Sequence, residues 1–241
     1  MEQFYKSREF IGASVGIVSI LLAISPNYIF LLAVALLSCL MAFELSRALG
    51  IKNISLFSPV VFLLSCYNLG IGLLFSLLIS FIKGYRSWNL DELLKSLTIF
   101  IYSGALPSYL YTVKSSNDYE LVKLLLFVWS VDVFAYYAGK TLGKTPFFPK
   151  LSPKKTWEGF FGGFFVGSIV FVLTSNIPLF RSVLLGTWLV LLAVSGDLFK
   201  SFIKRQVGIK DFSSILGEHG GFTDRFDSLL FVAPVYSLFL N

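Results

Sequence analysis

Long apolar runs are the feature that most limits what this chain can fold into. Residues 28–46 contain a single charged residue, and comparable runs recur along the sequence. A helix needs ~17–25 residues of this kind to cross the hydrocarbon core of a bilayer. The runs do not alternate apolar and polar residues, as the strands of a membrane barrel do. The sequence therefore predicts an all-α, polytopic integral membrane protein.

The composition agrees with a membrane protein. Charged residues make up 14% of the chain and the mean hydropathy is +0.77, whereas soluble domains carry about 25% charged residues. The net charge of +6 is expected from cytoplasmic loops rich in Lys and Arg, so no nucleic-acid partner is predicted. Cys39 and Cys66 lie in apolar runs and indicate no disulfide framework.

About nine membrane segments are predicted, at residues 10–25, 28–46, 56–67, 69–82, 95–113, 120–139, 159–175, 180–196 and 226–240. With a cytoplasmic N-terminus, seventeen of the twenty Lys and Arg residues fall on the cytoplasmic side, which supports this orientation. We expect one membrane domain, 1–241, with N-terminal helices in 1–113. Helices carrying the charged motifs follow in 120–241, with cytoplasmic loops at 140–158 and 197–225.

The stretch 196–227 concentrates ten charged residues of both signs. Helical spacing places Asp197 and Lys204 on one face of a helix, and Asp224 and Asp227 on one face at the start of the last segment. Carboxylates at adjacent helix ends repel each other unless a cation lies between them. Because oxygen ligands without cysteine favour a hard cation, the pattern predicts Mg²⁺ or a similar ion.

Two acidic residues lie inside apolar runs. Asp132 is about two turns from the cytoplasmic end of its segment, and a carboxylate at that depth is costly and usually functional. Glu44 lies near the end of its segment, where it could pair with Arg47 at i+3. The sequence does not decide whether Glu44 is structural or functional.

The loop 139–159 carries five lysines before its first acidic residue, Glu158. Within it, residues 152–159 combine a proline turn, hydroxyls and two lysines beside a helix start, which favours phosphate binding. Together with the acidic stretch, this predicts phosphoryl or nucleotidyl transfer to a lipid, with charge on the phosphate neutralised by metal and fixed cations. The sequence contains no G-x-x-x-x-G-K-[ST] motif.

These residues resemble the signature of the phosphatidate cytidylyltransferases, or CDP-diacylglycerol synthases. The resemblance covers about residues 125–241. Its motifs are Ser201-Phe-Ile-Lys204-Arg205, Lys210-Asp211 and His219-Gly220-Gly221-Phe-Thr-Asp224-Arg225-Phe-Asp227, with Gly196-Asp197, the Asp132–Gly139 helix end and the 152–159 loop. The N-terminal half matches only as generic membrane helices.

The resemblance implies that CTP and phosphatidic acid form CDP-diacylglycerol and pyrophosphate in a bacterial inner membrane, with the active site facing the cytoplasm. It implies Mg²⁺, leaving a second cation and a homodimer open. The implied metal ligands are Asp197, Asp224, Asp227 and Asp132. The implied catalytic residues are Asp197, Lys204, Arg205, Lys210, Asp211, His219, Asp224, Arg225 and Asp227. The implied substrate-binding residues are Ser152, Lys154, Lys155, Thr156, Glu158, Ser201, Gly220 and Gly221.

Two positions depart from the family pattern. Lys200 stands where glutamate is common, which replaces a negative charge beside Asp197 by a positive one. Val133 follows Asp132 where a hydroxyl residue is usual. Either change could alter metal affinity or lipid preference.

Two other functions fit parts of the pattern. A CTP-dependent lipid kinase would use a similar membrane site but transfer the γ-phosphate and release CDP. A transporter or channel would use Asp132 and Glu44 as pathway residues, but here the charged residues gather at one face.

Overall fold

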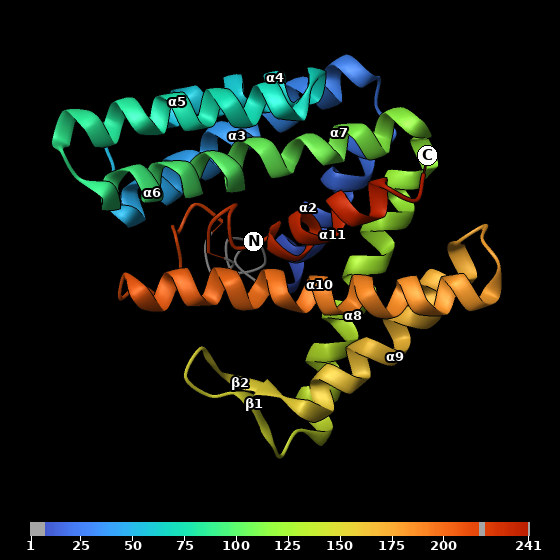
Figure 1. The fold of residues 1–241 in the computed structure, drawn as a ribbon. Coiled ribbons are helices and arrows are strands. Elements are labelled where there is room, and N and C mark those ends of the chain that lie inside the picture. Colours follow the sequence, from blue (N-terminus) through green and yellow to red (C-terminus); the bar gives the residue numbers. More distant parts are fainter. Residues whose placement is uncertain (1–7, 217–219, 241) are drawn as a thin grey trace.

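The computed structural model describes residues 8–216 and 220–240. These residues form helices and one short antiparallel hairpin, β1–β2 (Figure 1). The helices are α2 (Arg8–Ala23), α3 (Asn27–Leu49), η1 (Ser55–Phe57), α4 (Ser58–Tyr67), α5 (Leu69–Ser87), α6 (Leu90–Phe100), η2 (Ile101–Ala105), α7 (Leu106–Ser116), α8 (Asp118–Leu142), α9 (Trp157–Thr174), α10 (Leu179–Gln206) and α11 (Asp227–Ser237). The strands are β1 (Pro146–Phe148) and β2 (Ser152–Thr156).

Five described helices are long and apolar enough to cross a membrane, namely α3, α5, α8, α9 and α10. This confirms the prediction of an all-α integral membrane protein. The count of nine segments and the cytoplasmic N-terminus stay predictions. The predicted segment at 56–67 is a ten-residue helix, α4, after the turn η1, which is shorter than a full span.

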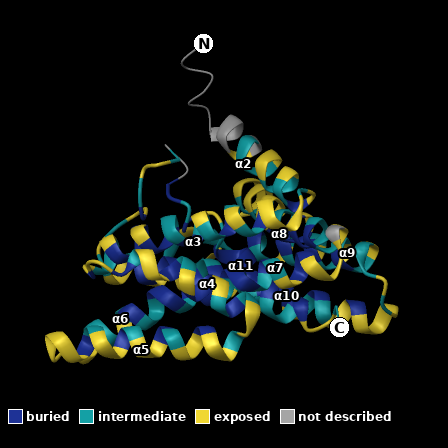
Figure 2. Cartoon of the chain, turned by 90° about the horizontal axis from the view of Figure 1, so that it is seen from above, coloured by how far each residue is buried: buried dark blue, intermediate teal, exposed yellow. Residues whose placement is uncertain are grey.

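Exposed apolar side chains mark the outer faces of the bundle. Helix α5 exposes Leu74, Leu77, Leu78 and Phe81, and exposed residues follow its length in Figure 2. Buried residues gather where α11 and α7 pack together (Figure 2). In water such exposed leucines would be costly, whereas against lipid chains they are neutral.

Small residues bring helices close together where the charged motifs lie. A Cβ at Gly163 of α9 would lie 2.6 Å from the carbonyl oxygen of Val131 on α8, so glycine allows the two backbones to approach. A Cβ at Gly196 of α10 would lie 2.6 Å from the carbonyl oxygen of Asp227 on α11. This second approach brings Asp197 next to Asp227.

The two predicted loops contain more regular structure than expected. Helix α8 continues to Leu142, and β1 and β2 then form the hairpin that fills most of 140–158. Helix α10 continues to Gln206. The connection predicted at 197–225 therefore begins about ten residues later, and Asp197 and Lys204 are helical, as their spacing indicates.

Candidate active site

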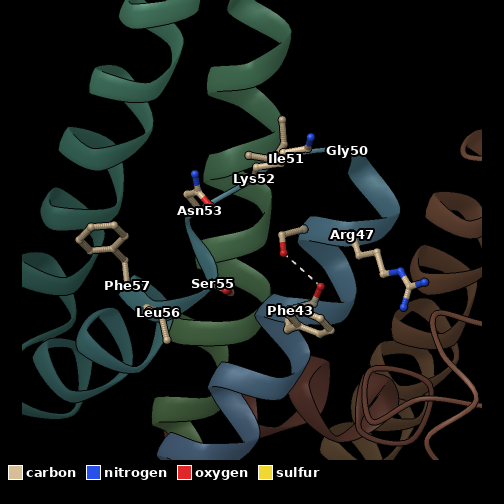
Figure 3. A pocket seen from close by; sticks show the side chains of 10 residues that line it. Phe43, Arg47, Gly50, Ile51, Lys52, Asn53, Ser55, Leu56 and Phe57 are labelled. Atoms are coloured by element: carbon tan, nitrogen blue, oxygen red, sulfur yellow. Dashed lines mark hydrogen bonds between the residues drawn. The ribbon is translucent and has the colours of Figure 1, made fainter.

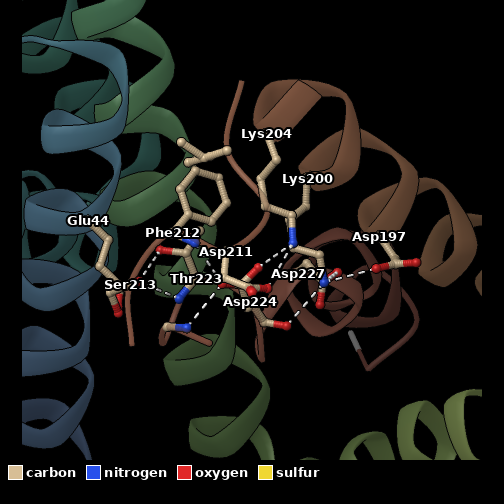
Figure 4. Close-up of polar contacts among 12 residues, drawn as sticks. Glu44, Asp197, Lys200, Lys204, Asp211, Phe212, Ser213, Thr223, Asp224 and Asp227 are labelled. Carbon is tan, nitrogen blue, oxygen red and sulfur yellow. Dashed lines mark hydrogen bonds and ion pairs between the residues drawn. The ribbon is translucent and has the colours of Figure 1, made fainter. Parts of the chain in front are cut away.

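An ammonium group lies between two carboxylates where α10 meets α11. The Nζ atom of Lys200 is 2.9 Å from Oδ1 of Asp197 and 2.6 Å from Oδ2 of Asp227 (Figure 4). It also donates a 3.1 Å hydrogen bond to the backbone oxygen of Asp224. Lys200 is 8% exposed, so these contacts form largely away from water and are strong. The structure thus places the lysine that departs from the family pattern at the centre of the predicted metal site.

A second lysine joins this group, and a third carboxylate lies on α8. Lys155 of β2 forms an ion pair with Oδ2 of Asp197. Burial lowers the pKa of Lys155 to about 8, and Asp227 partly opposes this shift. Asp132 of α8 is exposed and forms no ion pair with these residues in the part of the chain that the structure describes, so only longer-range charge interactions link it to Asp227, Lys155 and Lys200. These five residues, Asp132, Asp197, Asp227, Lys155 and Lys200, are called the acid–lysine cluster below.

Asp224 has a different set of partners. Its Oδ1 is 2.7 Å from Nζ of Lys204, and its Oδ2 accepts hydrogen bonds of 3.0 Å from the backbone N–H groups of Phe212 and Gly221 (Figure 4). The residue is 8% exposed. Both oxygens are therefore engaged in holding the chain segments 212 and 221 against α10. The metal-ligand role predicted for Asp224 stays untested, and these contacts favour an organising role.

Glu44 joins the N-terminal half to the same loop. This α3 residue is 1% exposed, and Oε1 accepts hydrogen bonds from Ser213 Oγ (2.6 Å) and Phe222 N (3.0 Å). Oε2 accepts them from Thr223 N (2.8 Å) and Thr223 Oγ1 (2.7 Å) (Figure 4). Four donors satisfy the buried carboxylate without the predicted pair with Arg47. Glu44 therefore positions the loop that carries Asp224.

The glycine pair leaves room for these two carboxylates. Gly220 has φ +76°, in the left-handed region that favours glycine, and a Cβ there would lie 2.8 Å from Oδ2 of Asp224. A Cβ at Gly221 would collide with the Glu44 carboxylate. The two glycines thus serve the turn itself, and a role in substrate binding stays a prediction.

Three of the predicted site residues, at the hairpin and on α10, make local structural contacts. Thr156 Oγ1 caps α9 by accepting from Gly159 N (3.2 Å), and Glu158 accepts from Thr145 N through both oxygens, at 3.2 and 3.3 Å. Arg205 of α10 donates from Nε to the carbonyl oxygen of Leu151 (3.1 Å), which ties the hairpin to α10. These contacts explain three of the predicted site residues by local structure.

The remaining predicted residues differ in their exposure. Three of them are exposed, namely Lys154, Lys210 and Arg225. Asp211 forms a long ion pair with Lys204, 3.9 Å from Oδ1 to Nζ, and its side chain is 47% exposed. Ser201 is buried on α10 and Ser152 is half-buried where β2 begins. His219 lies outside the described residues.

Tyr102 is a site neighbour for which the sequence offers no signal beyond an aromatic in an apolar run. It lies in the π-helical turn η2, is 2% exposed, and its hydroxyl has no hydrogen-bond partner among the described residues. Its ring stacks on Phe199 of α10, 5.9 Å between centroids, and packs against Phe231 of α11. π-Helical turns are frequent at functional sites.

A separate pocket of about 570 Å³ lies at the carboxyl end of α3 (Figure 3). It lies between α3 and the turn η1, and no predicted site residue lines it. Its lining residues are Phe43, Ser46, Arg47, Gly50, Ile51, Lys52, Asn53, Ser55, Leu56 and Phe57. None of the residues that the sequence predicts for catalysis, substrate binding or metal binding is among them.

The donor set of the cluster fits a divalent metal only in part. Within residues 8–216 and 220–240, no three His, Cys, Asp or Glu side chains converge as a metal site requires. Asp197 and Asp227 do present oxygens to one point, now taken by Lys200. Mg²⁺ is commonly bound by one or two carboxylates together with substrate phosphates and water. Asp197 and Asp227, with Asp132 nearby, are the carboxylates that suit such an ion.

Taken together, the fold is that of an integral membrane protein, and its site gathers lysines and carboxylates suited to phosphate esters. The chain belongs to the Cytidylyltransferase family, whose sequence profile matches residues 6–241. It is therefore a nucleotidyltransferase, as its motifs predict.

Named relatives agree with this family. The chain is 46% identical over 240 residues to the phosphatidate cytidylyltransferase of Aquifex aeolicus (strain VF5), covering 99% of this chain and 92% of the relative. It is 34% identical over 187 residues to that of Haemophilus influenzae, covering 70% of this chain and 64% of the relative. It is 37% identical over 142 residues to that of Bacillus subtilis (strain 168), covering 56% and 53%. The resemblance to phosphatidate cytidylyltransferases is thus confirmed.

Proposed function

We propose that the chain transfers the cytidylyl group of CTP to phosphatidic acid, which yields CDP-diacylglycerol and pyrophosphate. The observation that carries this proposal is the 46% identity to a phosphatidate cytidylyltransferase over 99% of the chain. The reaction forms a bond between an oxygen of the lipid phosphate and the α-phosphorus of CTP. It breaks the bond between that phosphorus and the bridging oxygen to the β-phosphate, so pyrophosphate leaves with the electron pair.

The charged residues of the cluster have roles that suit this reaction. Lys155 and Lys200, with the exposed Lys154, Lys210 and Arg225, supply cations for the three phosphates of CTP and the phosphate of the lipid. The attacking lipid phosphate is already anionic near neutral pH. A strong general base is therefore unnecessary, and His219 is assigned to orienting the Gly220 turn or a phosphate.

Mg²⁺ is the proposed cofactor, held by Asp197 and Asp227 with Asp132 near. When bound, it neutralises charge that develops on the transferred phosphate and on the leaving pyrophosphate. Asp197 and Asp227 hold the cation position, Asp132 adds negative charge beside it, and Asp224 keeps the adjoining loop in place through Lys204.

The site is proposed to face the cytoplasm of a bacterial inner membrane, where CTP is available. The distribution of Lys and Arg supports this orientation, because seventeen of twenty fall on that side in the nine-segment topology. Cysteine labelling from either side of sealed vesicles would test it, with a cysteine placed at the exposed Lys154. Labelling from the periplasmic side only would contradict the orientation.

The reaction is tested with purified protein in detergent, CTP labelled in the cytidine, phosphatidic acid and Mg²⁺. The expected products are a labelled CDP-lipid and pyrophosphate in equal amounts. Release of CDP with a phosphorylated lipid would support the lipid kinase alternative. Absence of any nucleotide product from folded protein would overturn the proposal.

A further inference from the structure

The position between Asp197 and Asp227 is filled by a side chain of the protein itself. Lys200 reaches it from α10, one turn after Asp197, and contacts oxygens of both carboxylates at 2.9 and 2.6 Å. The side chain of Lys200 is 10% exposed and that of Asp227 is 6% exposed. Carboxylates this close, on two helices that touch at Gly196, require a positive charge between them.

The charges of the cluster show what this lysine replaces. Counting only the residues in ion-pair contact, two carboxylates and two ammonium groups are balanced. With a glutamate at position 200, three carboxylates and one ammonium group would leave a net charge of −2. A site of charge −2 attracts a further cation, whereas a balanced site does not need one before nucleotide binds.

The third contact of Lys200 fixes it at this position. Its hydrogen bond to the backbone oxygen of Asp224, at 3.1 Å, joins the ammonium group to the loop that Glu44 holds. The ammonium group donates one hydrogen bond, to the Asp224 carbonyl, and forms ion pairs with the carboxylates of Asp197 and Asp227. These three contacts and its burial distinguish Lys200 from a mobile surface lysine.

We propose that Lys200 is a built-in cation of the active site, which occupies the position of a metal ion between Asp197 and Asp227 until CTP binds. The inference rests on the proposed function only in that the site binds Mg²⁺ together with CTP. It follows that this enzyme has no tight metal site until the phosphates of CTP supply further oxygen ligands.

The test is Mn²⁺ binding to the full-length protein in detergent without nucleotide, followed by electron paramagnetic resonance of the free ion. The wild-type protein and the charge-keeping Lys200→Arg variant are expected to bind Mn²⁺ at least tenfold more weakly than Lys200→Met and Lys200→Glu. Adding Asp197→Asn to Lys200→Met is expected to abolish the gain. Lys95→Met removes the lysine of an exposed pair with Asp91 (2.7 Å) and is expected to change nothing.

Tight, submillimolar Mn²⁺ binding by the wild-type protein without CTP would overturn the proposal, and this measurement needs no variant. Equal binding by the wild type and Lys200→Met would also overturn it. Mn²⁺ binding is measured without turnover, so the role of Lys200 can be refuted while the CDP-lipid assay still succeeds. If the Mn²⁺ results are as expected but no CDP-lipid is formed, only the proposed function is overturned.

Discussion

Glu44 provides the sharpest prediction, because one side chain from the N-terminal half holds the loop that carries Asp224. In Glu44→Gln, one of the two carboxylate oxygens becomes an NH₂ group. If the NH₂ group replaces Oε1, it faces the Ser213 hydroxyl and the Phe222 N–H. If it replaces Oε2, it faces the hydroxyl and the N–H of Thr223. A hydroxyl can rotate and accept, but a backbone N–H cannot. One buried donor is therefore left without a partner.

The cost can be worked from these contacts. A hydrogen bond to a charged group contributes ~1.5–3 kcal/mol, and an unsatisfied buried donor costs about 1–3 kcal/mol. We expect Glu44→Gln to destabilise the loop by roughly 2–4 kcal/mol, because the remaining bonds persist. This is smaller than the ~5–15 kcal/mol that separates folded from unfolded proteins. The loop should open while the helices stay folded.

Hydrogen exchange at the Phe222 and Thr223 amides measures this opening. A loss of 2–4 kcal/mol corresponds to roughly 30- to 1,000-fold faster exchange, since about 1.4 kcal/mol is a factor of ten. CDP-lipid synthesis should fall with it. Glu92→Gln is the matched control, because Glu92 forms a partly exposed pair with Lys83 at 4.0 Å and should change exchange little. Unchanged exchange at both amides in Glu44→Gln would refute the reasoning.

Three further predictions follow from single contacts. Asp224→Asn breaks the buried pair with Lys204 and should cost about 3–5 kcal/mol in thermal unfolding without metal; unchanged metal-free stability would contradict the organising role. Gly163→Leu places a side chain against the Val131 carbonyl and should lower stability in detergent by at least ~1–3 kcal/mol, with no change counting against close α8–α9 packing. Tyr102→Phe removes a buried hydroxyl that has no partner within residues 8–216 and 220–240 and should raise the stability of the substrate-free protein by about 1 kcal/mol. A loss of stability of Tyr102→Phe, measured before CTP is added, would contradict an unpartnered Tyr102 hydroxyl.

Much of the fold follows from local patterns. The apolar runs predict most helices within a few residues, because a helix that faces lipid must satisfy its own backbone and present apolar side chains. The spacing of Asp197 and Lys204 predicts their shared helix, and α10 carries both. The boundaries of the charged loops are less well predicted, since α10 continues ten residues past the apolar run, where polar contacts to the hairpin and loop stabilise it.

The partners of the charged residues are harder to predict. Asp224 and Asp227 read alike in sequence, as acids three residues apart at a helix start. In the structure Asp227 faces Lys200, whereas Asp224 turns toward Lys204 and two backbone amides. Such a division depends on how the loop before α11 folds back on α10.

The sequence by itself determined that the chain is an all-α membrane protein, which residues could handle phosphate, and that Lys200 departs from the family pattern. Only the tertiary structure decided that Lys200 lies between Asp197 and Asp227, and that Glu44 holds residues 222 and 223, nearly 180 positions later. The physical reason is that helical periodicity fixes neighbours on one helix. Contacts between helices depend instead on packing at small residues such as Gly196, which local sequence does not encode.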